Sequence, residues 1–310
     1  PATSPNKLVN GSVAGLGTGD VASLGLGGAG TFKSSDGVLS LIGIAPGPQD
    51  LIAFRHSRAV DMGTTGNPDR GLIRRDLDVT NGGTIPVVDL AGAESFAAAT
   101  AMVTITNAVS GETLTHAVSY RSGASCSSAS LYSYGGLGTP AMFPISGIPA
   151  GQQRAGDVHQ MSVTAIEGTL PNVTGARVAL ENFGPLVNRS VALPPPLGVP
   201  VVTTLTGNYK RLQAVYQVPS PFISTIFLYL SLSPVRTVTI TASSAWLGGT
   251  SATLALPDFT GLAGWNPTAW APATTATGTW SAQATGSNIT SANLCQADGR
   301  IVSADKRGTF

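Results

Sequence analysis

The sequence predicts an all-β protein made of sandwich-type domains, and three observations lead to this prediction. Short runs of Val, Thr, Ala, Ser and Leu alternate with turn residues, since the 310 residues include 38 Gly and 21 Pro. Such runs favour strands, and the residues between them favour tight turns. Hydrophobic residues make up 42% of the chain and charged residues only 11%, so apolar surface for a core is plentiful. No stretch has the 3.6-residue periodicity of an amphipathic helix.

Strands are expected first between Lys7 and Arg55. Ser35-Asp36-Gly37 is a tight-turn signal there, and Pro46-Gly47-Pro48 is another. The apolar runs between glycine-rich turns cover residues 8–13, 21–26, 38–42 and 51–54. This repetition of strand and turn predicts a small β-sandwich.

Turn glycines and alternating apolar positions give this N-terminal segment a recognisable pattern. Its members are Val9, Gly11, Val13, Asp36, Gly37, Val38, Leu39, Leu41, Ile44, Pro46, Gly47, Leu51, Ile52 and Ala53. In these residues the segment resembles the carboxypeptidase-regulatory-like family, whose members are transthyretin-type β-sandwiches. One departure is that Pro48-Gln49-Asp50 stands where the family often has an aromatic residue. The resemblance implies a transthyretin-like domain over residues 1–90 and implies no activity.

The remainder of the chain continues the pattern of strand and turn. Residues 101–108 alternate in character, with Val103 and Ile105 on one side, as a half-buried strand does. Further strands are expected at residues 113–120, 161–166, 176–180, 199–205, 213–218, 223–232, 237–242, 253–256, 279–284 and 301–303. The three prolines at 194–196 impose a stiff extended segment between the two halves. We therefore expect antiparallel β-sandwich domains over residues 91–197 and 198–310, or one unit formed by both.

Most of the chain also resembles uncharacterised bacterial exported lipoproteins. The shared residues beyond the N-terminal domain are Arg74-Arg75-Asp76-Leu77, Pro257-Asp258-Phe259 and Gly264-Trp265-Asn266. The small, polar opening Pro1-Ala2-Thr3-Ser4-Pro5-Asn6 is typical of a tether that follows a signal peptide or a lipid-modified cysteine. The expected location is periplasmic or extracellular, with a possible lipid anchor before Pro1 that attaches the protein to a membrane surface.

Charge and hydropathy exclude two classes of partner. The formal net charge is +1, and no basic stripe is present that would bind nucleic acid. The longest apolar stretch, Phe222 to Leu232, is far shorter than the ~20 residues of a membrane-spanning helix. The chain is therefore expected neither to bind nucleic acid nor to span a membrane.

Cys126 and Cys295 are the two cysteines of the chain. In an exported protein an even number of cysteines favours a disulfide, which here would join distant segments and stabilise the fold by roughly 5 kcal/mol in the chain-entropy model. The alternative is two unrelated free thiols. Their spacing resembles no metal site.

The densest charge lies between Asp50 and Asp78, and its arginines are candidate partner contacts. They are Arg55, Arg58, Arg70, Arg74 and Arg75. Arginine binds carboxylates and phosphates in a bidentate manner, which suits docking. Because acidic residues balance the arginines, the alternative is a set of ion pairs satisfied within the chain, which would also protect a strand edge.

Evidence for catalysis is weak in the sequence. Asp157 and His159 are two residues apart, so on one strand they share a face and could orient a general base or bind a metal. No nucleophile motif accompanies them. We expect that the protein is not an enzyme and that it binds no cofactor and no metal. The alternative is a hydrolase whose active site has no recognisable motif.

Tryptophans concentrate in the last third of the chain, and Trp265 and Trp270 are candidate residues for stacking on sugars. The alternative is that these rings fill a core, where large aromatic side chains contribute most. The preferred function is a non-enzymatic structural or accessory subunit of a periplasmic or cell-envelope assembly, for example a photosynthetic or respiratory membrane complex, acting through other protein subunits. A carbohydrate-binding surface module is the other alternative.

Overall fold

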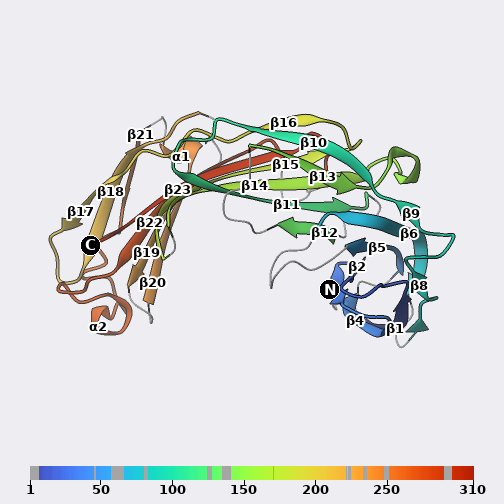
Figure 1. The fold of residues 1–310 in the computed structure, drawn as a ribbon. Coiled ribbons are helices and arrows are strands. Elements are labelled where there is room, and N and C mark those ends of the chain that lie inside the picture. Colours follow the sequence, from blue (N-terminus) through green and yellow to red (C-terminus); the bar gives the residue numbers. More distant parts are fainter. Residues whose placement is uncertain are drawn as a thin grey trace.

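The structure is a computed structural model. It describes residues 7–44, 47–56, 66–79, 83–123, 128–134, 141–169, 171–220, 222, 225–232, 236–247, 251–289 and 295–310. The protein is 60% strand and 4% helix, which confirms the all-β prediction. Figure 1 shows an elongated molecule, with β1 and β4 at one end and β17–β20 at the other.

The N-terminal end consists of two facing sheets. One has the order β4-β1-β7, with β8 also paired to β1, and the other has the order β3-β2-β5-β6-β9. The first contains β1 (Lys7–Ala14), β4 (Gly37–Ile44), β7 (Gly83–Thr84) and β8 (Val88–Asp89), and the second contains β2 (Val21–Leu26), β3 (Ala29–Lys33), β5 (Gly47–His56), β6 (Pro68–Val79) and β9 (Phe96–Ala97). Both sheets contribute to one hydrophobic core whose buried members run from Val9 to Leu90. We call these strands the N-terminal sandwich.

Strand β5 is buried on both of its faces. Leu51 and Ala53 belong to the core of the N-terminal sandwich, whereas Ile52 and Phe54 belong to the much larger core of the rest of the protein. Alternate residues of a strand point to opposite faces, so one strand serves two cores. The N-terminal sandwich is therefore packed against the remainder of the chain.

The remainder is organised on one eight-stranded sheet with the order β12-β11-β14-β15-β23-β22-β19-β20. Its strands are β11 (Glu112–Arg121), β12 (Ser128–Tyr134), β14 (Val158–Thr169), β15 (Asn172–Phe183), β19 (Thr225–Leu232), β20 (Arg236–Ser243), β22 (Thr279–Ser287) and β23 (Arg300–Thr309). A sheet of order β13-β10-β16 and a sheet of order β17-β18-β21 complete it. They contain β10 (Ala99–Thr106), β13 (Met142–Gly147), β16 (Arg189–Ala192), β17 (Val201–Leu205), β18 (Arg211–Gln217) and β21 (Ser251–Ala255).

The last strand, β23, joins the two halves of the large sheet. It pairs with β15 along one edge and with β22 along the other, both antiparallel. One hydrophobic core accordingly extends from Ala101 of β10 to Ala304 of β23. The segments 91–197 and 198–310 thus share a sheet and a core.

In the ranges that the structure describes, helical structure is confined to single turns. These are a 3₁₀ turn (Ala150–Gln152), α1 (Ser244–Leu247) and α2 (Pro267–Trp270). In α2, Asn266 caps the first turn by accepting a hydrogen bond from the amide of Ala269 at 3.2 Å. No helix in the described ranges is long and apolar enough to cross a membrane.

Candidate functional site

A β-bulge in β6 shapes the contact between the N-terminal sandwich and the rest of the protein. Arg75 and Asp76 of β6 lie opposite the single residue Asp50 of β5. Asp76 has a φ of 55°, in the left-handed region, and its amide donates to Oδ1 of Asp50 at 2.9 Å. An extra residue of this kind changes the direction of the neighbouring side chains, and it turns Arg75 away from its own sandwich.

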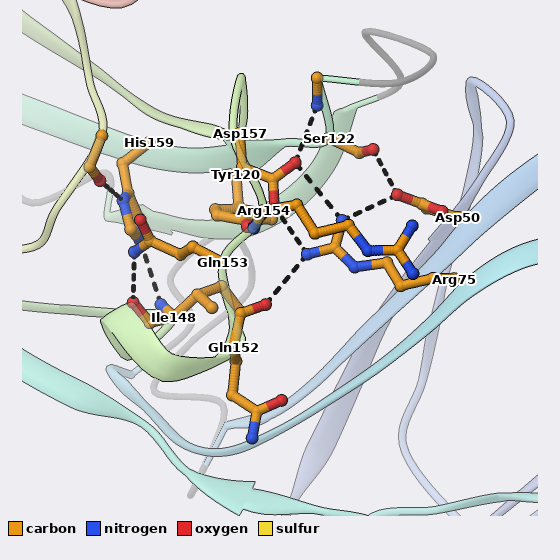
Figure 2. Close-up of polar contacts among 12 residues, drawn as sticks. Asp50, Arg75, Tyr120, Ser122, Ile148, Gln152, Gln153, Arg154, Asp157 and His159 are labelled. Carbon is orange, nitrogen blue, oxygen red and sulfur yellow. Dashed lines mark hydrogen bonds and ion pairs between the residues drawn. The ribbon is translucent and has the colours of Figure 1, made fainter.

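The guanidinium of Arg75 bridges two buried carboxylates, as Figure 2 shows. Its Nη1 donates to Oδ2 of Asp50 at 2.8 Å, and its Nη2 donates to Oδ2 of Asp157 at 2.6 Å. Nη2 also donates to the carbonyl of Gln152 at 3.0 Å. Asp50 lies on β5, whereas Asp157 directly precedes β14 of the large sheet. The arginine therefore joins acids from two separate sheets.

Asp157 is the most heavily hydrogen-bonded acceptor of this group. Besides Arg75, it accepts from the hydroxyl of Tyr120 at 2.5 Å and from the amides of Gly123 at 2.9 Å and Arg154 at 2.8 Å. Burial raises the pKa of Asp157, but the hydrogen bonds from Arg75, Tyr120 and the two amides outweigh it and hold the pKa below its usual value. The carboxylate is therefore ionised at neutral pH.

Asp50 is held in the same way. Burial raises the pKa of Asp50. Hydrogen bonds from the Ser122 hydroxyl, the amide of Asp76 and Arg75, together with the positive charge of Arg75, outweigh burial and bring the pKa below the usual value. The Asp50 and Asp157 side chains are only 2% and 1% exposed. We call Asp50, Arg75, Tyr120, Ser122 and Asp157 the Arg75 network.

A second ion pair crosses the same contact at the surface. Nη1 of Arg154 donates to Oδ2 of Asp76 at 2.6 Å, and both side chains are more than half exposed. Exposed pairs of this kind contribute little to stability. Among the described residues, the buried Arg75 network is therefore the main polar contact between the N-terminal sandwich and the rest of the protein.

His159 lies close to the Arg75 network and is held as a neutral imidazole. Its Nε2 accepts from the amide of Ile148 at 3.0 Å, so Nδ1 carries the proton and donates to the carbonyl of Gly184 at 2.8 Å. Burial lowers the pKa of His159 to about 4. Tyr120 lies between Asp157 and His159, the two residues of the hydrolase alternative. Its hydroxyl donates a hydrogen bond to Asp157, and its ring is edge-on to the His159 ring, with centroids 5.1 Å apart. Both nitrogens of His159 are thus engaged with backbone groups.

The other histidines are also buried. His56 shares a hydrogen bond with the Ser23 hydroxyl at 2.9 Å and one with the carbonyl of Gly66 at 2.9 Å, and burial lowers its pKa. His116 stacks on Phe143 with ring centroids 3.9 Å apart. Across the described part of the chain, no group of three or more His, Cys, Asp or Glu side chains is arranged to hold a metal ion.

Three of the remaining candidate arginines, Arg55, Arg70 and Arg74, make contacts within the chain. Arg55 binds Asp69 through Nε and Nη2 at 3.1 and 2.6 Å. Arg70 donates to the Ser95 hydroxyl at 2.6 Å. Arg74 holds Glu94 with Nε and Nη2 at 2.9 and 2.7 Å; Arg58 lies outside the described residues. Their role as partner contacts stays a prediction.

The other predicted site residues are the two cysteines and the two tryptophans. Cys295 is disulfide-bonded, but Cys126 lies outside the described residues, so the pairing of the two stays a prediction. Trp265 is half-buried and Trp270 is 57% exposed, and their ring centroids are 5.6 Å apart.

Sequence reasoning missed Tyr120 and Ser122 as members of the network. Tyr120 lies near the end of β11, in a run with the ordinary alternation of a half-buried strand, and Ser122 directly follows that strand. No local signal marks them, because their partners Asp157 and Asp50 are distant in the sequence. Asp50 and Arg75 lie in the charge-rich segment, and Asp157 was singled out by its spacing from His159; these are the signals that the sequence offered.

Comparison of the sequence with protein-family models and with curated proteins gave no match. The fold and the site therefore rest on the geometry described above.

Proposed function

We propose that this chain is a non-enzymatic structural or accessory subunit of a periplasmic or cell-envelope assembly. The observation that carries the proposal is the Arg75 network, which connects the N-terminal sandwich to the large sheet. Its ionised side chains are bonded to one another across this contact. Together with the shared burial of β5, the network makes one extended rigid body. A rigid body of this kind presents surfaces at fixed separations, which is what a scaffold requires.

The outer face of β4 is the surface that we propose for partner subunits. Val38 and Ile42 of this strand are 72% and 74% exposed. Leu8 of β1 is paired with Ile42 and is also exposed. Neighbouring exposed apolar residues on a sheet often mark a protein contact. A membrane complex, photosynthetic or respiratory, is the class of assembly that we propose.

The family resemblance belongs to the same proposal. We infer that residues 1–90 are a transthyretin-like domain of the carboxypeptidase-regulatory type. Two features support this: Asp36 directly precedes β4, which begins at Gly37, and Gly11 of β1 lies where an added Cβ would come within 2.6 Å of the Ile85 side chain. Both glycines belong to the pattern on which the resemblance rests.

The test is affinity capture from solubilised native envelope with the wild-type chain and two variants. Ile42→Asp places a charge on the proposed surface, and Val201→Asp places one on an exposed valine of β17. We expect one set of subunits to be captured by the wild type and by Val201→Asp but lost with Ile42→Asp. Equal capture by all three proteins would contradict the proposed surface, and a wild-type chain that captures no subunit would contradict the function.

A carbohydrate-binding surface is the second candidate, because Trp270 is exposed beside Trp265. The Trp265 and Trp270 ring centroids are 5.6 Å apart, and the exposed ring of Trp270 offers an apolar face on which a sugar could stack. Glycan-array binding that is lost with Trp270→Ala and kept with Trp246→Ala would support this candidate. Absence of binding by the wild type would remove it.

A hydrolase centred on Asp157 and His159 has weaker support. A general base needs an accessible nitrogen, whereas both nitrogens of His159 are bonded to backbone groups. Hydrolytic activity that disappears with His159→Ala would revive this alternative.

A further inference from the structure

Among the described strands, β20 is an outer strand of the eight-stranded sheet. It pairs with β19 over its full length, from Arg236 to Ser243, without a bulge. On its other side it pairs with no strand of the described chain. Proteins usually protect such an edge with charged residues, proline or a bulge, but apart from Arg236 at its beginning β20 contains no charged residue and no proline. The edge is therefore ready to pair with another strand.

The sequence of β20 has nearly the same pattern in both directions. Residues 237–241 read Thr-Val-Thr-Ile-Thr, with Thr239 at the centre. An antiparallel pairing of two such strands about Thr239 would set Thr opposite Thr and Val238 opposite Ile240. Cross-strand pairs of β-branched residues and of threonines are favourable. A second copy of the same strand is therefore a well-matched partner.

A groove of about 440 Å³ lies beside this edge, between β20 and β21. Trp246 of α1 is one of its lining residues and is 75% exposed. None of the lining residues is charged; they are Ile240, Thr241, Ala242, Ser243, Trp246, Thr253, Leu254, Ala255 and Pro257. The cores of protein interfaces are poor in charge and rich in tryptophan. The uncharged lining and the exposed tryptophan are therefore typical of a surface that binds another protein.

We propose that two copies of this chain associate through β20, antiparallel and symmetric about Thr239. The two eight-stranded sheets then join into one, and Trp246 of each copy packs against the partner copy near the beginning of its β20. A contact of this type is isologous, because the same patch is used on both copies. The proposal goes beyond the proposed function, since it names the chain itself as a partner and uses the end of the molecule away from β4.

The test uses the purified full chain and measures its mass in solution by light scattering over a range of concentrations. Thr239 is exposed, so Thr239→Lys and Thr239→Glu can be introduced without burying a charge. Each variant alone sets like charges opposite each other, and we expect its dimer to dissociate at least about tenfold more readily. An equal mixture of the two variants sets Lys opposite Glu, and we expect the dimer to return.

Thr203→Lys is the matched control, because Thr203 is an exposed threonine on β17, the outer strand of another sheet. It should leave the dimer unchanged. Trp246→Ala is a second probe of the same contact and should also raise the dissociation constant, about tenfold. Circular dichroism verifies that each variant keeps its strands. A wild-type chain that stays monomeric, a dimer insensitive to Thr239→Lys, or a mixture that fails to restore the dimer would each overturn the proposal.

Discussion

Arg75 and Asp157 form a buried ion pair between two sheets that are distant in the sequence. Nη2 of Arg75 donates to Oδ2 of Asp157 at 2.6 Å, and the bulge in β6 points the arginine toward this acid. Breaking a buried pair costs more than making it gains, because the remaining partner is left as an uncompensated charge. The pair therefore ties the folding of the N-terminal sandwich to the rest of the chain.

Replacing Arg75 with methionine should destabilise the protein strongly. The variant leaves Asp50 and Asp157 buried with no cation between them, and we expect a loss of about 3–5 kcal/mol in the free energy of unfolding. Urea denaturation measures it. The control is Arg154→Met, which removes only the exposed pair with Asp76 and should cost less than about 1 kcal/mol. Equal losses in the two variants would show that the buried network has no special role.

The stability of the protein should fall in acid because of Asp50 and Asp157. Both carboxyls have a pKa below the ordinary 3.8 in the folded state. Their contribution is therefore complete above the unfolded pKa and is lost as the pH falls through the lower, folded pKa. Urea denaturation of Asp157→Asn should accordingly show a smaller loss of stability between pH 5 and 2 than the wild type. A variant with the same slope as the wild type would contradict this assignment.

His159 should remain neutral far below the ordinary pKa of a histidine, 6.5, because burial lowers its pKa to about 4. Heteronuclear NMR of the imidazole nitrogens should find the Nδ1-protonated form, which the bonds to Ile148 and Gly184 require. The midpoint of its protonation should lie near pH 4. A titration midpoint near 6.5, or a proton on Nε2, would contradict the described geometry.

Ala304 of β23 lies in the core shared by both halves of the large sheet and is 1% exposed. Ala304→Asp would place an unpaired charge there, and we expect it to destabilise the protein by more than about 4 kcal/mol. Thr309→Asp at the exposed end of the same strand should change stability by less than about 0.5 kcal/mol. The yield of folded protein and its thermal unfolding compare the two variants. If both behave alike, β23 does not join the two halves as described.

Cys295 is disulfide-bonded, and we predict that Cys126 is its partner. Peptide mapping by mass spectrometry without reductant should recover the two cysteines in one cross-linked peptide. Reduction should lower the free energy of unfolding by about 2–5 kcal/mol. Recovery of both cysteines as free thiols from the untreated protein would contradict the prediction.

Local sequence patterns predicted the strands well where one face of a strand is buried. In β10 the buried residues Ala101, Val103 and Ile105 alternate with more exposed ones, as the period-2 pattern indicated. β5 is different: its consecutive residues Leu51 to Phe54 are all buried, because two cores share the strand. A run of apolar residues alone does not distinguish that arrangement from others.

The pairing of distant strands and side chains could not be predicted. The charge-rich segment drew attention to Arg75, but its partner Asp157 depends on a bulge in β6 that has no local sequence signature beyond Asp76. Likewise, the pattern of β23 predicts a strand and does not reveal that the strand pairs with both β15 and β22. These features arise from tertiary packing, which single-strand periodicity does not contain.

The claim that the N-terminal sandwich and the large sheet form one rigid body can be tested most directly by differential scanning calorimetry. The wild-type protein should unfold in a single cooperative transition, with its calorimetric enthalpy equal to the van't Hoff enthalpy. Arg75→Met should separate an early transition for the N-terminal sandwich from a later one. Two separate transitions in the wild type would contradict the claim, and with it the scaffold role that we propose.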